Sequence, residues 1–333
     1  MSAPPPRENP DLRGHAAAEA ALAAAMRGGR LHHAWLLTGP PGIGKATLAF
    51  RFARRLLAGL PAEEGQGLAL PPAHPVFRRV AAGTHADLLT IARGFDEKRK
   101  RLRAEIVVEE VRGIAGFLRL TPAEGGWRVV VVDGADHLNR NAANALLKVL
   151  EEPPPRALLL LTAAAPGRLL PTIRSRCRAL RLAPLGEADM AALLAAHLPE
   201  LPAAGRARLL ALGEGSPGRA LALAEADGLR LAGLVDELLA SLPRPDPGAG
   251  QALADALGRA EDGFSTFLGL LRAALAAAVR AAAGGGGGAY AGRPLAEWVR
   301  VWQALGELQD ETERFNLDRR QALIEGVALL RGS

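Results

Sequence analysis

Residues 34–47 read AWLLTGPPGIGKAT and decide the fold of this chain. The run is apolar up to Gly39, and Gly39, Gly44 and Lys45 match the P-loop pattern of a glycine, a short spacer, and Gly-Lys before Ser or Thr. The glycines of such a loop let backbone N–H groups turn toward phosphate oxygens, and the N-terminus of the next helix adds partial positive charge. The stretch therefore predicts a phosphate site between a buried strand and a helix.

The predicted cradle consists of Gly39, Gly42, Gly44 and Lys45 and then departs from the pattern. Ala46 stands where the pattern has Ser or Thr, so the hydroxyl that ligates Mg²⁺ is missing there. Thr47 follows, but one step along a helix turns a side chain by about 100°. Binding of ATP stays open, with Mg²⁺ only if ATP is bound, and a relic turn without nucleotide is the alternative.

A second motif is the strand pattern RVVVVD at residues 128–133, where four valines in a row suit a buried strand. In P-loop ATPases an aspartate at this place, here Asp133, holds Mg²⁺ through water, and a glutamate beside it usually activates the attacking water. The neighbour here is Gly134. We expect Asp136 to cap the next helix rather than to act as the base. Two missing groups in two motifs argue against hydrolysis.

Apolar runs alternate with helical stretches in the first half of the chain, which predicts a parallel sheet covered on both faces. After about residue 184 the pattern is helical only. The five glycines at 284–288 cannot be helical and predict a loop. The runs that predict strands are residues 34–38, 87–91, 128–133, 158–162 and 179–182.

Composition agrees with an α/β protein rich in helices, since 49% of the 333 residues are hydrophobic but only 4% are aromatic. The net charge of +6 is compatible with nucleic acid nearby, and equally with arginine-rich coding. Cys177 is the one cysteine, so no disulfide forms within the chain. No signal-like segment and no aliphatic run long enough for a bilayer stands out, and we expect a cytoplasmic protein that does not contact a membrane.

A third motif joins NALLKVLEEPP at residues 144–154 to PTIRSRC at residues 171–177, one strand later. In this combination the chain resembles the bacterial clamp-loader AAA+ subunits, the group of DNA polymerase III gamma/tau and delta-prime. LHHAW at residues 31–35, RLLPTIR at residues 168–174 and the missing glutamate at Gly134 are similar to the delta-prime branch, whose members commonly do not hydrolyse ATP.

The resemblance implies a AAA+ P-loop parallel-sheet domain at 1–183, a small helical lid at 184–228 and an all-α collar domain for oligomerisation at 229–333. It implies that Arg176 acts in trans, as an arginine finger on a nucleotide bound by the neighbouring subunit; a surface salt bridge is the plain alternative. Arg219 is the candidate for the lid arginine that touches nucleotide, or it merely begins a helix. Thr162 is the nearest polar residue to the sensor position after the fourth strand, and Cys177 is expected to be structural.

The function implied is that of a delta-prime-type subunit, which helps to load the sliding clamp onto primed DNA during replication. Its partners would be the gamma/tau and delta subunits and, through the complex, the clamp and primer–template DNA. Many relatives carry a four-cysteine zinc module, but residues 60–85 of this chain hold no cysteine. His74 and His85 are the candidate zinc ligands there, and two ligands are too few, so we expect no zinc. The basic segment at residues 93–103 can attract DNA phosphates, although a solvated loop explains it as well.

Other functions stay open at this stage. A gamma/tau-like subunit that hydrolyses ATP itself is the first, and Ala46 and Gly134 argue against it. A P-loop kinase for small nucleosides is the second, and the helical C-terminal half and the Ser-Arg-Cys motif argue against that. Membership of a polymerase holoenzyme would not make this chain a polymerase, because the sequence offers no plausible pair of polymerase carboxylates.

Overall fold

The computed structural model describes residues 4–29, 31–61, 67–96, 101–124, 126–242, 246, 248–257, 263–283 and 294–331. The predicted glycine loop at 284–288 and the centre of the basic segment, residues 97–100, lie outside this part of the chain. The described residues divide into two compact units, one up to Arg219 and one from Ala220 onward.

A five-stranded parallel sheet forms the middle layer of the first unit, in the order β2-β5-β6-β1-β7. Each of the predicted apolar runs is one of its strands, so the predicted α/β class is confirmed. The loops after β1, β5 and β6 meet at one edge, because parallel strands end on the same side. The strands are β1 Ala34–Thr38, β2 Leu88–Ile91, β5 Arg128–Val132, β6 Ala157–Ala163 and β7 Arg178–Arg181.

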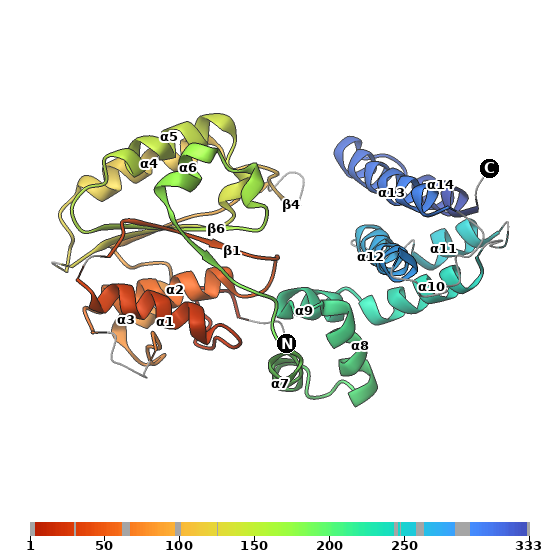
Figure 1. Cartoon of the computed structure of the whole chain (residues 1–333), viewed down its shortest axis with the longest axis horizontal. Coiled ribbons are helices and arrows are strands. Elements are labelled where there is room, and N and C mark those ends of the chain that lie inside the picture. Colours follow the sequence, from red (N-terminus) through yellow and green to blue (C-terminus); the bar gives the residue numbers. More distant parts are fainter. Residues whose placement is uncertain are drawn as a thin grey trace. The chain divides into compact units, whose positions relative to one another are not determined.

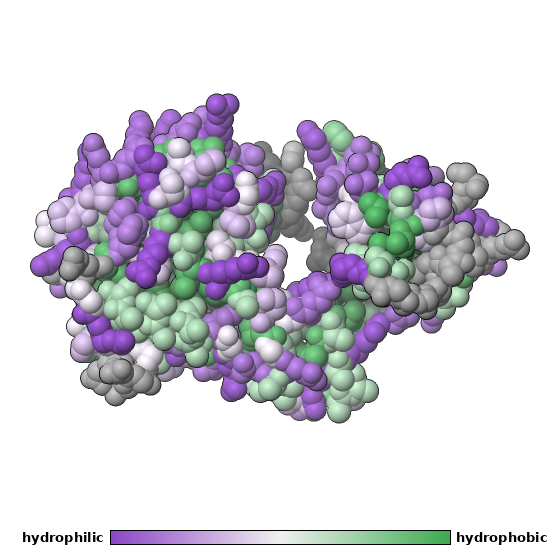
Figure 2. Space-filling view, in the orientation of Figure 1, coloured by the Kyte–Doolittle hydropathy of each residue, from purple (hydrophilic) through white to green (hydrophobic). Residues whose placement is uncertain are grey.

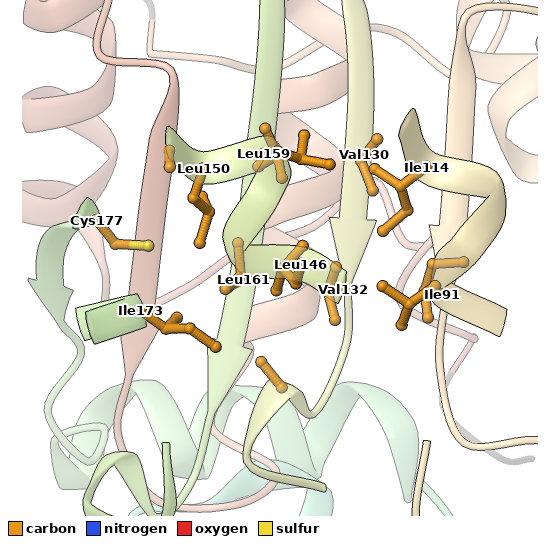
Figure 3. Close-up of a cluster of buried hydrophobic side chains, with 14 of the residues drawn as sticks. Ile91, Ile114, Val130, Val132, Leu146, Leu150, Leu159, Leu161, Ile173 and Cys177 are labelled. Atoms are coloured by element: carbon orange, nitrogen blue, oxygen red, sulfur yellow. The ribbon is translucent and has the colours of Figure 1, made fainter. Parts of the chain in front are cut away.

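Helices cover both faces of this sheet (Figure 1). On one face lie α1 (Ala16–Arg27), α2 (Lys45–Leu57) and α3 (Pro75–Ala81), and on the other lie α4 (Val108–Arg119), α5 (Arg140–Glu151) and α6 (Pro171–Arg176). The second face holds a continuous aliphatic core between the sheet and α4, α5 and α6 (Figure 3). In the view of Figure 2, hydrophilic side chains gather over α4, α5 and α6, whereas the surface over α1 is more apolar.

Short elements complete the first unit. Two 3-10 turns follow β5 and β6, and three further helices follow β7. A two-residue antiparallel hairpin between β2 and α4 was not predicted. These elements are η1 Ala135–His137, η2 Pro166–Arg168, α7 Glu187–His197, α8 Ala203–Gly213, α9 Pro217–Glu225, β3 Phe95–Asp96 and β4 Arg101–Leu102.

In its described residues, the second unit has helices as its regular elements and no strand, as predicted. Its helices are α10 Gly228–Ala240, α11 Ala249–Leu257, α12 Gly263–Ala283, α13 Leu295–Phe315 and α14 Arg319–Arg331. The division between Arg219 and Ala220 falls within α9, so it does not separate a lid at 184–228. The division into three domains stays a prediction.

Among the described residues there is one helix, α12, whose length and apolar composition would allow it to cross a membrane. The helix does not stand out as an aliphatic run in the sequence, because alanine supplies much of its hydropathy. Core helices of soluble proteins pass the same test, and α12 buries Phe267, Leu271 and Leu275 within its own unit.

Candidate functional site

The P-loop links β1 to α2 and takes the backbone shape that its glycines allow. Gly39, Gly42 and Gly44 have φ values of +146°, +73° and +102°, which side chains with a Cβ rarely adopt. A Cβ on Gly39 would lie 2.4 Å from the carbonyl oxygen of Leu182. The glycines are therefore required by the fold of the loop itself, whether or not a phosphate binds.

Lys45 is buried, and its ammonium is turned onto its own loop. Its Nζ donates to the carbonyl oxygens of Gly39 at 2.7 Å and Pro40 at 2.6 Å. Burial lowers the pKa of Lys45, while the charges of Asp133 and Asp136 act in the opposite direction. The lysine lies at the predicted site, and a phosphate would have to compete with two carbonyl groups for it.

The first turn of α9 rests directly on the P-loop. Ser216 Oγ donates to the carbonyl oxygen of Pro41 at 2.8 Å, and the Gly218 amide donates to that of Gly42 at 2.9 Å. A Cβ on Gly42 would lie 2.6 Å from Ser216 Oγ. The sequence suggested Arg219 only as a contact to nucleotide. It did not predict that Ser216 and Gly218, beside Arg219, bind the P-loop.

Arg219 lies in the first turn of α9, with its side chain directed to Glu214. Its Nη1 donates to Glu214 Oε2 at 2.6 Å, and its amide donates to Ser216 Oγ at 3.2 Å. The residue is thus close to the P-loop through its backbone, and its guanidinium is paired elsewhere.

The other residues predicted for the nucleotide site lie at the ends of β5 and β6 and at the start of α2. Asp133 accepts a hydrogen bond of 2.6 Å from Thr162 Oγ1, and the same hydroxyl accepts one of 2.9 Å from the Gly134 amide. Thr162 therefore ties the end of β6 to the end of β5. The side chain of Thr47 is buried in α2, and Ala46 offers no hydroxyl.

The prediction that Asp136 caps the next helix is wrong. Asn139 caps α5 instead, with its side chain accepting from the Ala142 amide. Asp136 Oδ2 accepts hydrogen bonds from the amides of Ala164 and Ala165 at 3.0 and 2.7 Å. A helix-capping pattern involves only residues close in sequence, so it does not predict these two partners. Its buried carboxylate holds the β6–η2 loop, and this role leaves one oxygen, Oδ1, without a partner among the described residues.

Arg176 is the last residue of α6 and lies away from the chain's own P-loop motif in the sequence. Its Nη2 is 3.0 Å from Glu151 Oε1 at the end of α5, and its Nη1 donates to the Thr172 carbonyl oxygen at 3.1 Å. The side chain is 36% exposed, so a second protein can reach it. Sequence reasoning did not connect Glu151 with Arg176, although Glu151 stands in the quoted Leu-Glu-Glu-Pro-Pro motif.

Cys177 follows Arg176 and faces the core. Burial raises the pKa of its thiol to about 12, so the reactive thiolate is disfavoured at neutral pH. This agrees with the structural role expected for it.

Metal ligands do not cluster in the part of the chain that the structure describes. No group of three His, Cys, Asp or Glu side chains there could hold a metal ion. His74 Nδ1 accepts from the Val76 amide at the start of α3, and His85 is buried beside Asp87. Part of the 60–85 segment, residues 62–66, is not described.

Comparison with known proteins places these residues in one family. A family model described as DNA polymerase III, delta subunit matches residues 14–186, just over half of the 333 residues. The DNA polymerase III subunit delta' of Pseudomonas aeruginosa is 44% identical over 193 residues, which is 57% of this chain and 56% of that protein. The subunit delta' of Escherichia coli K12 is 38% identical over 226 residues, 68% of this chain and 64% of that protein. The chain therefore spans less than two thirds of these curated relatives.

Two further similarities are weaker. The DNA polymerase III subunit tau of Escherichia coli K12 is 34% identical over 172 residues, 52% of this chain and 25% of that protein. Among solved structures, a gamma subunit-related protein of Thermotoga maritima has a TM-score of 0.40 and 20% identity, covering 93% of this chain and 98% of that one.

Proposed function

This chain belongs to the DNA polymerase III delta-subunit family, and from that premise we propose that it is a delta-prime-type subunit of a bacterial clamp loader. The observation that carries the proposal is that the family match at residues 14–186 contains all three motifs: the P-loop, the Asp133 strand and Arg176. The two delta' relatives are more similar to the chain than the tau relative is.

The proposed subunit hydrolyses no ATP of its own. A general base must reach the attacking water, and Gly134 stands at the place of that base. The nearby carboxylate of Asp136 is engaged by two amides, and Asp133 accepts from Thr162. Asp133 and one oxygen of Asp136 thus hold loops in place, which supports the absence of hydrolysis.

ATP itself could still bind as a structural ligand. Gly39, Gly42, Gly44 and Lys45 would hold its phosphates, and Mg²⁺ would enter only with ATP. Lys45 would first have to leave the carbonyls of Gly39 and Pro40. We propose no zinc.

The chemical contribution of the subunit is Arg176, offered in trans to a neighbour's nucleotide. An arginine stays charged in proteins and binds phosphate oxygens through paired N–H groups. Arg176 is 36% exposed and ends a helix, so a partner can reach its guanidinium. Supplied in trans, such an arginine is worth about 10³–10⁵ in rate in other nucleotide hydrolases.

The partners follow from the same family. We propose that the chain assembles with gamma/tau-type and delta-type subunits, acts on the sliding clamp and on primer–template DNA through that complex, and works in the cytoplasm. The second candidate function is that of a gamma/tau-like subunit that hydrolyses ATP itself, and the similarity to the tau subunit supports it.

The test joins two measurements. Binding of a fluorescent ATP analogue and ATP turnover are followed with the isolated chain, which is expected to show no turnover. Arg176→Ala is then placed in the reconstituted complex and should lower the clamp- and DNA-stimulated ATPase rate by at least about tenfold without impairing assembly. Steady turnover by the isolated chain would favour the gamma/tau-like function, and an unchanged rate with Arg176→Ala would remove the in-trans role.

A further inference from the structure

We propose that Glu151 is a positioning residue for Arg176, a role that rests on the proposed action of Arg176 in trans. Glu151 ends α5 and Arg176 ends α6, so their ion pair joins two helix ends that are distant in sequence. Glu151 would not touch the nucleotide, but would fix the direction in which the guanidinium points.

The contacts of Arg176 leave it free to bind a further group. Glu151 Oε1 lies 3.0 Å from Nη2, and the Thr172 carbonyl oxygen lies 3.1 Å from Nη1. A guanidinium has more N–H groups than these two contacts use. Arg176 can therefore keep both contacts and still present donors to phosphate oxygens, which is what a preoriented arginine requires.

The backbone on each side of the pair is anchored in the core. Ile173, one turn before Arg176, and Cys177, just after it, are buried, and Figure 3 shows them beside the core residues of α5 and β6. Leu150, directly before Glu151, belongs to the same cluster. Because both main chains are fixed, the freedom that remains is in the two side chains, and the ion pair restricts it.

Helix stability alone does not account for a glutamate at this position. The C-terminus of a helix carries partial negative charge, so an acidic residue in the last turn is unfavourable there. Glu151 is the final residue of α5. Its side chain is 49% exposed, and pairs this open to solvent contribute little to folding. Its effect is thus expected in the orientation of Arg176 rather than in stability.

The charge of Glu151 also limits how it can act. A carboxylate close to a triphosphate would repel it unless the arginine stood between them. Glu151 therefore has a favourable effect on a neighbour's nucleotide only through Arg176. Removal of Arg176 should abolish the benefit of Glu151, and this dependence separates positioning from a merely structural role.

The experiment is a double-mutant cycle on the reconstituted complex. Glu151→Gln should lower the stimulated kcat for ATP about fivefold, with a smaller change in KM, because an interaction made mainly in the transition state is weakened. In the Arg176→Ala background the same substitution should change kcat by less than about 1.5-fold. Glu152→Gln, which removes the same charge one residue further on, is the matched control and should leave kcat unchanged.

Each outcome decides something. A lower rate with Arg176→Ala and an unchanged rate with Glu151→Gln would overturn the positioning role and leave the proposed function intact. An increase with Glu151→Gln would mean that Glu151 competes for Arg176, and would also overturn the proposal. If Arg176→Ala itself has no effect, the proposed in-trans role of Arg176 fails first, and the positioning role fails with it. Unchanged thermal unfolding of Glu151→Gln confirms that the rate reports on Arg176 and not on folding.

Discussion

Lys45 illustrates how one residue limits the chemistry of this site. Its ammonium is buried and donates to two carbonyls of its own loop, which lie 2.7 and 2.6 Å away. A bound phosphate gains from Lys45 only what remains after these contacts are broken. Nucleotide affinity should therefore be lower than the sequence of the loop alone suggests.

His85 gives a prediction on pH at the same scale. Its side chain is 1% exposed, and its Nε2 has no hydrogen-bond partner among the described residues. Burial lowers the pKa of His85, Arg79 lowers it further, and Glu124 and Asp87 act against this. In the unfolded chain the ring takes up a proton at about pH 6.5. Between that pH and the lower folded pKa the unfolded state binds more protons, so stability falls as the pH falls.

The measurement is urea unfolding of the chain at about pH 7.5 and about pH 5.5. His85→Asn keeps an acceptor for the Asp87 amide but does not titrate. We expect the wild-type chain to lose more unfolding free energy than this variant between the two pH values, because only the wild-type chain has the ring of His85 to protonate on unfolding. Burial also lowers the pKa of His33 and of His137, so a smaller slope should remain in the variant. Equal slopes in the two proteins would show that His85 contributes nothing.

At the scale of elements, the strands could be predicted and the contacts between loops could not. The valines of β5 are fully buried, and their run of apolar residues in sequence is sufficient to identify a central strand. The β3–β4 hairpin was missed because its residues lie in a basic segment that looks like a solvated loop. The partners of Asp136 and of Arg176 were missed because Ala164 and Glu151 lie more than 20 residues away in the chain.

The docking of α9 on the P-loop gives a prediction for a pair of glycines. A Cβ on Gly218 would lie 2.8 Å from Gly42 Cα and 3.0 Å from its carbonyl oxygen. Because backbone cannot yield as a long side chain can, Gly218→Ala should push the two segments apart. We expect a loss of about 1–3 kcal/mol in the free energy of unfolding, and faster hydrogen exchange of the amide at position 218.

Gly116→Ala is the control for that substitution. Gly116 lies within α4, and a Cβ there meets nothing within 4 Å. It should stabilise the chain by about 0.5–1 kcal/mol, because alanine loses less backbone entropy than glycine. If both substitutions stabilised the protein equally, the contact between Gly42 and Gly218 would have to be looser than described.

At the scale of the whole molecule, each of the two compact units has buried hydrophobic residues of its own among the described residues. The aliphatic cluster around Val130 and Leu146 uses residues of the first unit alone. Phe267 and Leu271 belong to α12 in the second unit and are each 1% exposed. Cooperative unfolding follows contiguous cores, so each unit should open as its own step.

Paired substitutions test this division. Phe267→Ala should destabilise the second unit by about 3–5 kcal/mol and leave hydrogen-exchange protection of the sheet unchanged. Val130→Ala should do the converse, weakening protection of the sheet and leaving α12 unaffected. Loss of protection in both units with either substitution would show that the chain unfolds as one body.

The backbone at Gly134 has a consequence for any change toward the ATPase pattern, which has a glutamate at this position. Its φ of +79° is left-handed, and a Cβ there would lie 3.0 Å from the His137 ring. A glutamate at this place would have to keep a left-handed backbone, which costs a residue with a Cβ about 1–2 kcal/mol, and would have to displace the ring of His137. Gly134→Glu alone is therefore expected to lower the free energy of unfolding. In evolutionary terms, a chain that carries glycine in this turn can acquire the glutamate of the ATPase pattern only at a cost in stability.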